Sequence, residues 1–211
     1  MSTKLFINTL PEQTSKFLKK IRELDFLRDF YLSGGTALAL QLGHRESEDL
    51  DFFTKNKFNS DLVLQGLRQI DKLKNTEIEV GTVNAFLEGV QLQFLYYPYR
   101  LLQVTVDFDG IVLSSVIDIA CTKLLTISSR GNKKDFIDLF FILKQYSLRD
   151  LFEKTVEKYQ GIEYSQTHIL KSLVYFEEAD KQPMPRIHRK ISWEGIKKTI
   201  ISQVKNLDLS C

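Results

Sequence analysis

The stretch that decides the fold is LSGGTALALQLGHRESEDLDFF, residues 32–53. It opens on a Gly-Gly-Thr turn at residues 34–36 and closes on two aspartates that a single residue separates, Asp49 and Asp51. Apolar residues precede the turn and surround the aspartates, which is typical of short buried strands. The stretch therefore predicts a strand, a glycine turn, a short helix and a second strand that carries the acidic pair.

The acidic pair and the glycine turn are chemically complementary. Side chains alternate along a strand, so Asp49 and Asp51 leave the same face roughly 6.5 to 7 Å apart, close enough to serve one shared Mg²⁺ or a pair. The turn at Gly34 and Gly35 exposes backbone N–H groups, and the helix that begins at Thr36 presents its positive end beside them. A nucleoside triphosphate needs its phosphates held and its charge neutralised, and these two features would do both.

The loop between the turn and the aspartates adds further candidates. Arg45 is suited to be an extra phosphate clamp, and Ser47 lies in the same nucleotide-binding loop. We interpret His44 alone as an ordinary loop histidine. A glycine turn after a strand is also common scaffolding, and a single D-x-D is often a solvated strand end, so the functional prediction depends on their combination at this spacing.

The rest of the first half predicts a sheet with flanking helices. A capping-box pattern at residues 9–12 starts a helix that runs to about residue 27. The segments that we expect to be strands have β-branched and aromatic residues in alternation. They are residues 30–33, 50–53, 77–83, 85–97 with a turn at 88–89, and 103–108. Two more helices are expected, at residues 37–42 with Gly43 as the C-terminal cap and at 60–70.

Helical periodicity dominates downstream of Ser115. The expected helices span residues 116–128, 134–146, 148–159, 166–176 and 193–205. We therefore predict an α+β (mixed α/β) fold: a mixed sheet with flanking helices over residues 1–113, followed by a helical region over residues 114–211. The boundary is expected in the loop before Ser115.

Composition limits the class of protein. The chain has 211 residues, of which 43% are hydrophobic, with 15 Phe and 8 Tyr, enough for a sizeable core. We expect neither a membrane span nor a signal peptide, and the two cysteines give neither a disulfide framework nor a zinc pattern, so we expect a cytoplasmic protein. The net charge of +2 does not by itself indicate nucleic-acid binding, although the basic cluster at residues 186–190 is compatible with it.

A second group of charged residues lies in the helical region. Lys123 is surrounded by apolar residues in the helix expected at 116–128, so it either snorkels to solvent or reaches phosphate oxygens as a point charge. Asp135 and Asp138 lie one turn apart on the next helix. Asp135 near the start of that helix would also favour its dipole, so the residues alone leave its role open.

These motifs together resemble a known family. Residues 32–53 are similar to the signature of the DNA polymerase β type of nucleotidyltransferase, and their GGTAL and R-x-S-x-DLDFF text resembles the AbiEii/AbiGii toxin family. KLLTISSR at residues 123–130 resembles that family's lysine-to-arginine helix motif, and KKDFIDL at residues 133–139 resembles its terminal aspartate motif. Residues 173–176 and 192–194 also look like its C-terminal text, so the resemblance covers nearly the whole chain.

The resemblance implies an enzyme and a biological role. The enzyme would be a Mg²⁺-dependent (or Mn²⁺-dependent) nucleotidyltransferase that moves an NMP from an NTP to an acceptor, with pyrophosphate leaving. The role would be that of a toxin-antitoxin or phage-defence protein with a cognate antitoxin, and the acceptor would be RNA such as the tRNA 3′ end. The helical region would complete the active site.

The resemblance also implies roles for individual residues. Asp49 and Asp51 would be metal ligands and catalytic, together with Lys123 and Asp135, and Asp138 would be a structural partner of Arg130. The nucleotide would be bound by the glycine turn, by the loop and by basic residues of the helical region: Gly34, Gly35, Thr36, Arg45, Ser47, Lys123 and Arg130.

The sequence departs from the superfamily pattern at a third carboxylate. The strand where it is expected, at residues 90–95, offers only glutamines, whereas Asp107 and Asp109 lie at the end of another expected strand. The general base would then be Asp135, or metal and solvent would deprotonate the acceptor. Two alternatives stay open: a non-catalytic nucleotide- or RNA-binding module on the same fold, and an enzyme that nucleotidylates a protein or a small molecule.

Overall fold

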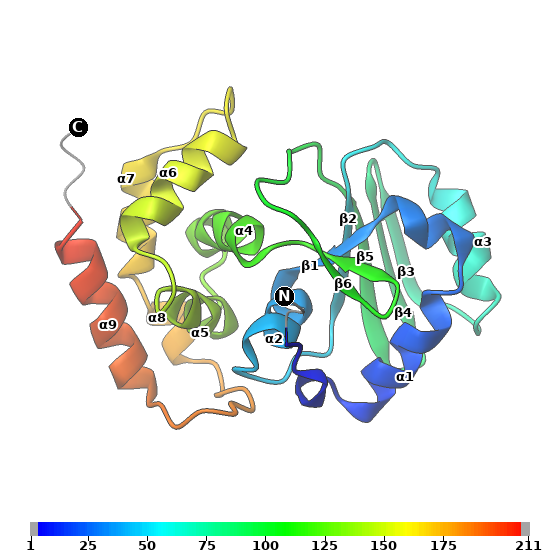
Figure 1. The fold of residues 1–211 in the computed structure, drawn as a ribbon, viewed down its shortest axis with the longest axis horizontal. Helices are drawn as coiled ribbons and strands as arrows, with labels where there is room; N and C mark the ends of the chain where they lie inside the picture. The colour runs from blue at the N-terminus through cyan, green and yellow to red at the C-terminus, as the bar shows by residue number, and fades with distance from the viewer. Residues whose placement is uncertain (1–3, 208–211) are drawn as a thin grey trace. The chain divides into compact units, whose positions relative to one another are not determined.

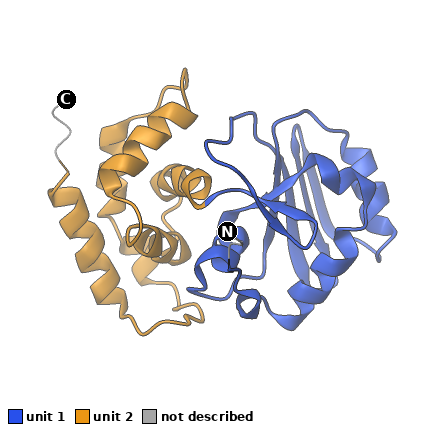
Figure 2. Cartoon of the chain, in the orientation of Figure 1, with its two compact units in different colours: residues 1–115 blue, residues 116–211 orange. Residues whose placement is uncertain are grey.

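The computed structural model describes residues 4–207. The chain divides into two compact units, residues 1–115 and residues 116–211 (Figure 2). Unit 1 contains a mixed sheet and unit 2 is helical, which confirms the predicted fold class. Among the described residues, none of the helices combines the length with the apolarity needed to cross a bilayer.

Within the described residues, unit 1 is built on a seven-stranded sheet in the order β3-β4-β5-β2-β1-β7-β6. The strands are β1 (Tyr31–Ser33), β2 (Leu50–Thr54), β3 (Lys74–Glu79), β4 (Thr82–Leu87), β5 (Val90–Tyr96), β6 (Val106–Phe108) and β7 (Ile111–Leu113). The helical segments are η1 (Ile7–Thr9), α1 (Glu12–Ile21), η2 (Asp25–Asp29), α2 (Gly34–Leu42) and α3 (Ser60–Arg68). Figure 1 shows α1 and α3 beside the β3–β4–β5 part of the sheet, whereas α2 follows directly from β1.

Strand β2 is central because it pairs on both sides. It runs antiparallel to β1, with Ser33 opposite Asp51, and parallel to β5, with Asp51 opposite Gln93. Leu50 and Phe52 are fully buried, as the alternation of the strand predicts. Asp51 therefore lies on the opposite face of β2 from these core residues, at the end of the strand where β1 gives way to α2.

Unit 2 is a helical bundle. Its helices are α4 (Val116–Ser129), α5 (Lys133–Ile142), α6 (Leu148–Lys158), α7 (Gln166–Leu173), α8 (Glu177–Asp180) and α9 (Trp193–Lys205). Trp193 packs edge-to-face on Phe136 and Phe176, with ring centroids 6.1 and 5.8 Å apart, which ties α9 to α5. A fully buried ion pair, Lys158 Nζ to Asp118 Oδ1 at 2.6 Å, links α6 to α4.

The structure corrects three local predictions. The capping box at residues 9–12 is wrong, because the Thr9 hydroxyl donates to the Phe6 carbonyl within η1 and α1 starts only after Pro11. The strand predicted over residues 77–83 is interrupted by a turn at Gly81, whose φ is +76°. The turn at residues 88–89 is confirmed, since both residues have a positive φ.

The third correction concerns the end of unit 1. A loop was expected before Ser115, but residues 111–113 form β7, and Leu113 pairs with Leu32 of β1. A turn at Asp109 and Gly110, with φ values of +53° and +86°, folds β7 back onto β6. Ser115 is buried as well, so no exposed linker stands at the expected boundary.

Candidate active site

The glycine turn lies directly against Asp51. Gly34 has a φ of +65°, a backbone conformation that glycine adopts without steric cost. A Cβ at this position would lie 2.1 Å from Oδ2 of Asp51. Both the backbone angle and the available space therefore require glycine, and the pairing of Ser33 with Asp51 produces this approach.

The N-terminus of α2 faces the same place. Its N-cap residue, Ser33, does not cap the helix with its side chain, because the Ser33 hydroxyl accepts a 2.8 Å hydrogen bond from Ser114 Oγ. The first N–H groups of a helix have no partner within the helix and carry its positive dipole. An anion beside Asp51 could therefore be bound by these amide groups.

The Thr36 side chain points away from the surface of the turn and into the protein. Its side chain is fully buried, and its hydroxyl donates to the backbone carbonyl of Asp49 and lies 2.9 Å from Ser47 Oγ. The hydroxyl thus fastens the loop that carries the acidic pair to the first turn of α2. Any contact of Thr36 with a phosphate would come from its backbone N–H.

Arg45 lies against the second glycine rather than in an open loop. Its side chain is only 2% exposed, and Nη1 donates to the Glu46 carbonyl at 2.9 Å. A Cβ at Gly35 would lie 2.5 Å from Nη2, so glycine is needed for this approach. The guanidinium is therefore a fixed positive charge next to the turn.

The two aspartates provide the donor set that Mg²⁺ prefers. Asp49 is exposed and directly precedes β2, and Asp51 is partly exposed on the strand. Mg²⁺ is commonly held by one or two carboxylates together with substrate phosphates and water. In the part of the chain that the structure describes, no group of three His, Cys, Asp or Glu forms a metal cage. Asp49 and Asp51 have the oxygen donors that could share Mg²⁺ with the phosphates of a bound nucleotide.

The position beside Asp51 on the neighbouring strand holds an amide. Gln93 is the parallel partner of Asp51, and its Nε2 donates to Asn84 Oδ1 on β4 at 3.0 Å. Neither alternative carboxylate replaces it, because β6 and its turn, which carry Asp107 and Asp109, are separated from β2 by β7 and β1. Gln93 therefore occupies the position beside Asp51 where the superfamily pattern has a third carboxylate.

A second charged cluster lies in unit 2. Lys123 Nζ is 2.7 Å from Asp135 Oδ1 and 2.7 Å from Asp138 Oδ2, and its side chain is 8% exposed. The alternative that Lys123 snorkels to solvent is therefore wrong. Arg130 donates from Nε to Asp135 Oδ2 at 3.1 Å while 59% of its side chain stays exposed.

The pairing inside this cluster differs from the predicted one. Asp138 was expected to be the structural partner of Arg130, but the structure places it on Lys123 and places Arg130 on Asp135. Burial raises the pKa of Asp135, but the Lys123 charge and the Arg130 hydrogen bond outweigh it, so the pKa lies below its ordinary value. Asp135 is therefore ionised near neutral pH.

The predicted site residues thus fall into two groups. Unit 1 brings together the turn, the loop and the acidic pair: Gly34, Gly35, Thr36, Arg45, Ser47, Asp49 and Asp51. Unit 2 brings together Lys123, Arg130 and Asp135. Sequence reasoning noted the glutamines of residues 90–95 but missed the hydrogen bond of Gln93 to Asn84, which depends on the register of β4 and β5. The completion of one active site by both groups stays a prediction.

Comparison with known proteins agrees with this geometry. The family model described as "Nucleotidyl transferase AbiEii toxin, Type IV TA system" matches residues 16–110 and 76–208. The chain belongs to the AbiEii nucleotidyltransferase toxin family. It is a nucleotidyltransferase, which sets aside the alternative of a non-catalytic binding module.

Individual relatives extend the comparison. The AbiEii-family chain is 37% identical over 205 residues to an uncharacterized protein of Aquifex aeolicus strain VF5, covering 93% of this chain and 96% of that protein. It is similar to the crystal structure of an H. pylori protein described as a nucleotidyltransferase, with a TM-score of 0.58, 17% identity and coverage of 92% and 94%. It is also similar to MenT4, a nucleotidyltransferase toxin from Mycobacterium tuberculosis H37Rv, with a TM-score of 0.58, 14% identity and coverage of 93% and 85%.

Proposed function

We propose that this AbiEii-family protein transfers an NMP from an NTP to RNA, such as the 3′ end of tRNA, in a reaction that requires Mg²⁺ or Mn²⁺. Pyrophosphate leaves, and a cognate antitoxin restrains the enzyme in the cytoplasm, in a phage-defence role. The observation that carries the proposal is the contact of Asp51 with the Gly34 turn at the N-terminus of α2. It supports the proposal because the Asp51 carboxylate, which would hold the metal, lies beside the backbone amides that would hold phosphate.

The residues of unit 1 bind the triphosphate. The N–H groups of Gly35 and Thr36 and the positive end of α2 hold phosphate oxygens, and buried Arg45 adds a fixed positive charge beside the turn. Asp49 and Asp51 would hold the metal, which when bound neutralises charge on the phosphates and orients them for in-line attack. Ser47 keeps the loop in place through Thr36.

The residues of unit 2 stabilise the charge that develops. Two carboxylates already balance the Lys123 charge, so Lys123 orders the cluster, and the largely exposed Arg130 is the cation of this cluster that would contact phosphate oxygens. Gln93 cannot accept a proton at the position of a third carboxylate. Asp135 is almost inaccessible and already paired with two cations, so the proton of the attacking hydroxyl goes to solvent.

The first test is nucleotide binding and transfer by Asp49→Asn and Asp51→Asn. Each variant should lose metal-dependent NTP binding, and label transfer from an α-³²P NTP to total tRNA should fall about a hundredfold or more. Asp107→Asn is the matched control, because it removes a carboxylate of unit 1 on a distant strand. NTP binding that needs no metal and survives both changes would overturn the proposed site.

The acceptor is tested in the same assay. Wild-type protein is given labelled NTP with purified tRNA, with an RNA-depleted lysate, or with small molecules such as aminoglycosides. Label in RNA supports the proposal. Label only in protein or in a small molecule would overturn the RNA acceptor while leaving the nucleotidyl transfer intact.

A further inference from the structure

A hollow of about 520 Å³ lies at the other end of the central strands from the acidic pair. It is formed where β1 begins and β2 ends, together with the segment that follows β5, and all of its lining belongs to unit 1. The lining residues are Arg28, Asp29, Phe30, Tyr31, Thr54, Lys55, Asn56, Tyr99, Arg100, Leu101 and Val112.

Aromatic rings support one wall of this hollow. Tyr99 packs edge-to-face on Tyr97 with ring centroids 4.7 Å apart, and Tyr97 packs on Phe53 at 4.8 Å. The Tyr97 N–H donates to the carbonyl of Thr54 at 2.7 Å, and Pro98 restricts the backbone before Tyr99. Tyr99 is thus a half-buried ring on a fixed support, which is the kind of surface on which a nucleic-acid base stacks.

The rim of the hollow is positively charged. Arg28, Lys55 and Arg100 are exposed around it and Asp29 is the acidic residue of the lining, so cations exceed anions by two among the lining residues. Arg28 also pairs with Asp25, just outside the lining, at 3.3 Å on the exposed surface. Single-stranded nucleic acid is bound by this combination of stacking rings with cations that follow the phosphates. The rim charge therefore complements a polyanion.

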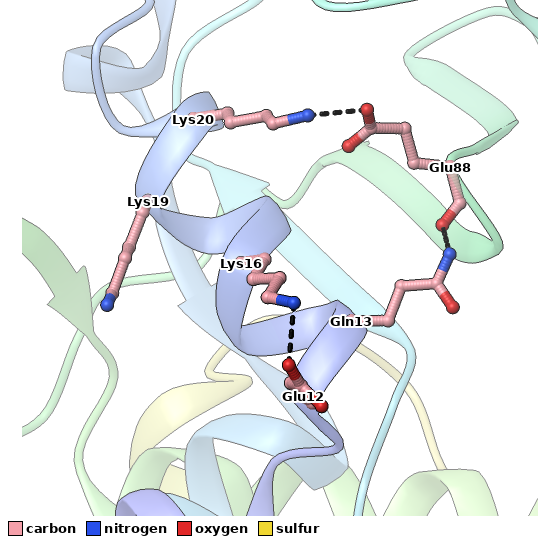
Figure 3. Close-up of a pocket in the computed structure, with 6 residues that line it drawn as sticks. All are labelled: Glu12, Gln13, Lys16, Lys19, Lys20 and Glu88. Carbon is pink, nitrogen blue, oxygen red and sulfur yellow. Dashed lines mark hydrogen bonds and ion pairs between the residues drawn. The ribbon is translucent and has the colours of Figure 1, made fainter.

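A larger hollow on α1 shows the contrast. It has a volume of about 880 Å³, and its three lysines lie beside two glutamates, with Lys16 paired to Glu12 at 2.6 Å and Lys20 to Glu88 at 2.5 Å (Figure 3). Its lining also contains no aromatic ring. It offers no stacking surface and little net charge.

The aromatic hollow is within reach of the acidic pair. Phe53 follows Asp51 by two residues, so it lies on the same face of β2 about 7 Å further along, and Tyr97 and then Tyr99 pack beyond it. An RNA strand whose reacting end lies at Asp51 could therefore extend a preceding base to Tyr99.

We propose that this hollow, defined by Tyr99, Arg28 and Lys55, binds single-stranded RNA upstream of the acceptor end by stacking one base on Tyr99. The inference rests on the proposed function, because it assigns the RNA of that reaction a second contact. It predicts binding that depends on bases as well as on phosphates. The hollow then holds the acceptor strand without taking part in the chemistry.

The experiment measures equilibrium binding of a fluorescent single-stranded RNA of about twelve nucleotides to the full chain, without NTP. Tyr99→Ala should weaken binding by about 5- to 100-fold, whereas Tyr99→Phe should bind like wild type, because stacking needs the ring and not the hydroxyl. Arg28→Ala and Lys55→Ala should each lower the slope of log affinity against log salt by about 0.7. Lys72→Ala is the matched control, an exposed lysine outside the hollow that should leave the slope unchanged.

A strand of equal length without bases separates stacking from charge alone. The proposal is supported if wild type binds the strand without bases more weakly than RNA and if Tyr99→Ala binds that strand with the same affinity as wild type. Equal binding of both strands, an unchanged affinity in Tyr99→Ala, or no RNA binding by wild type would overturn it. Metal-dependent NTP binding is measured on the same variants, because the proposed NTP site lies at the glycine turn and the acidic pair, away from the hollow. Normal NTP binding together with absent RNA binding would overturn only this inference, whereas lost NTP binding by wild type would count against the proposed function.

Discussion

Replacing Lys123 by methionine should destabilise unit 2 rather than leave folding intact. Methionine keeps the apolar stem but removes an ammonium that lies 2.7 Å from both Asp135 and Asp138. Both carboxylates are essentially inaccessible to solvent, with exposed fractions of 1% and 0%. The variant would leave one net negative charge or more inside the fold, depending on how Arg130 compensates.

The magnitude follows from the geometry. At 2.7 Å and an effective dielectric constant of about 20, each ion pair contributes about 6 kcal/mol of attraction before desolvation is subtracted. Desolvation of the three charges cancels most of this sum, but removing one partner of a buried pair does not recover that cost. Measured losses in such cases are about 3 to 5 kcal/mol, a large share of the stability of a typical domain.

The assay is urea unfolding followed by tryptophan fluorescence. Trp193 is the single tryptophan of the chain, and it packs on Phe136, the neighbour of Asp135, so its emission reports on unit 2. Lys16→Met is the matched control, because its side chain is 69% exposed and its pair with Glu12 lies in solvent, where ion pairs contribute little to stability.

The dependence on pH gives a second check. In the wild type the pKa of Asp135 is lowered, so its contribution to stability is present above its ordinary value of 3.8 and is lost as pH falls through the folded value. In the variant burial is less compensated and raises that pKa, so protonation relieves the cost as pH falls. The deficit should therefore be larger at pH 7 than at about pH 4. Equal unfolding midpoints for Lys123→Met and Lys16→Met, or a deficit that does not change with pH, would refute this reasoning.

Three further outcomes are expected. Gly34→Ala and Gly110→Ala both place alanine at a positive φ, which should cost each variant about 1 kcal/mol of stability. Only Gly34→Ala should also abolish metal-dependent NTP binding, because its Cβ would clash with Asp51. Equal NTP binding by the two variants would contradict this reasoning. Burial raises the pKa of Cys121 to about 11, so its thiol should be unreactive at pH 7 in the native protein. In a Cys211→Ser variant, a maleimide should therefore label no thiol until the protein is unfolded, as a count of labelled thiols would show. Trypsin should cut first in the irregular, largely exposed segment 181–190, as mass spectrometry of early fragments would reveal; early cuts after the buried Lys123 or Lys158 would contradict the structure.

Much of unit 1 could be predicted from local sequence. The glycine turn, the alternation around Asp51 and the turn at residues 88–89 are each encoded within a few residues, and each was correctly predicted. The capping box was wrong because α1 begins only after Pro11 and Thr9 belongs to a preceding 3₁₀ turn. β7 was missed because a three-residue strand carries no periodicity of its own and is defined by pairing with β1.

Long-range contacts explain what the sequence left open at the site. The burial of Arg45 and the pairing of Lys123 with Asp138 depend on segments that pack together only in the fold. A lysine in an apolar helix is compatible with snorkelling until a neighbouring helix supplies two carboxylates. The neighbour of Asp51 could be suggested from the glutamines of residues 90–95, but the register decides that it is Gln93.

The order of the strands also has a consequence for the timing of synthesis. β1, which leads into the phosphate-binding turn, obtains one of its two neighbours from β7, about eighty residues further along the chain. A ribosome adds about 5 to 20 residues per second, so roughly 4 to 16 seconds pass between the synthesis of Leu32 and that of its partner Leu113. During this interval one edge of β1 is unpaired. The strand that leads into the glycine turn therefore lacks β7, one of its two final neighbours, in the nascent toxin.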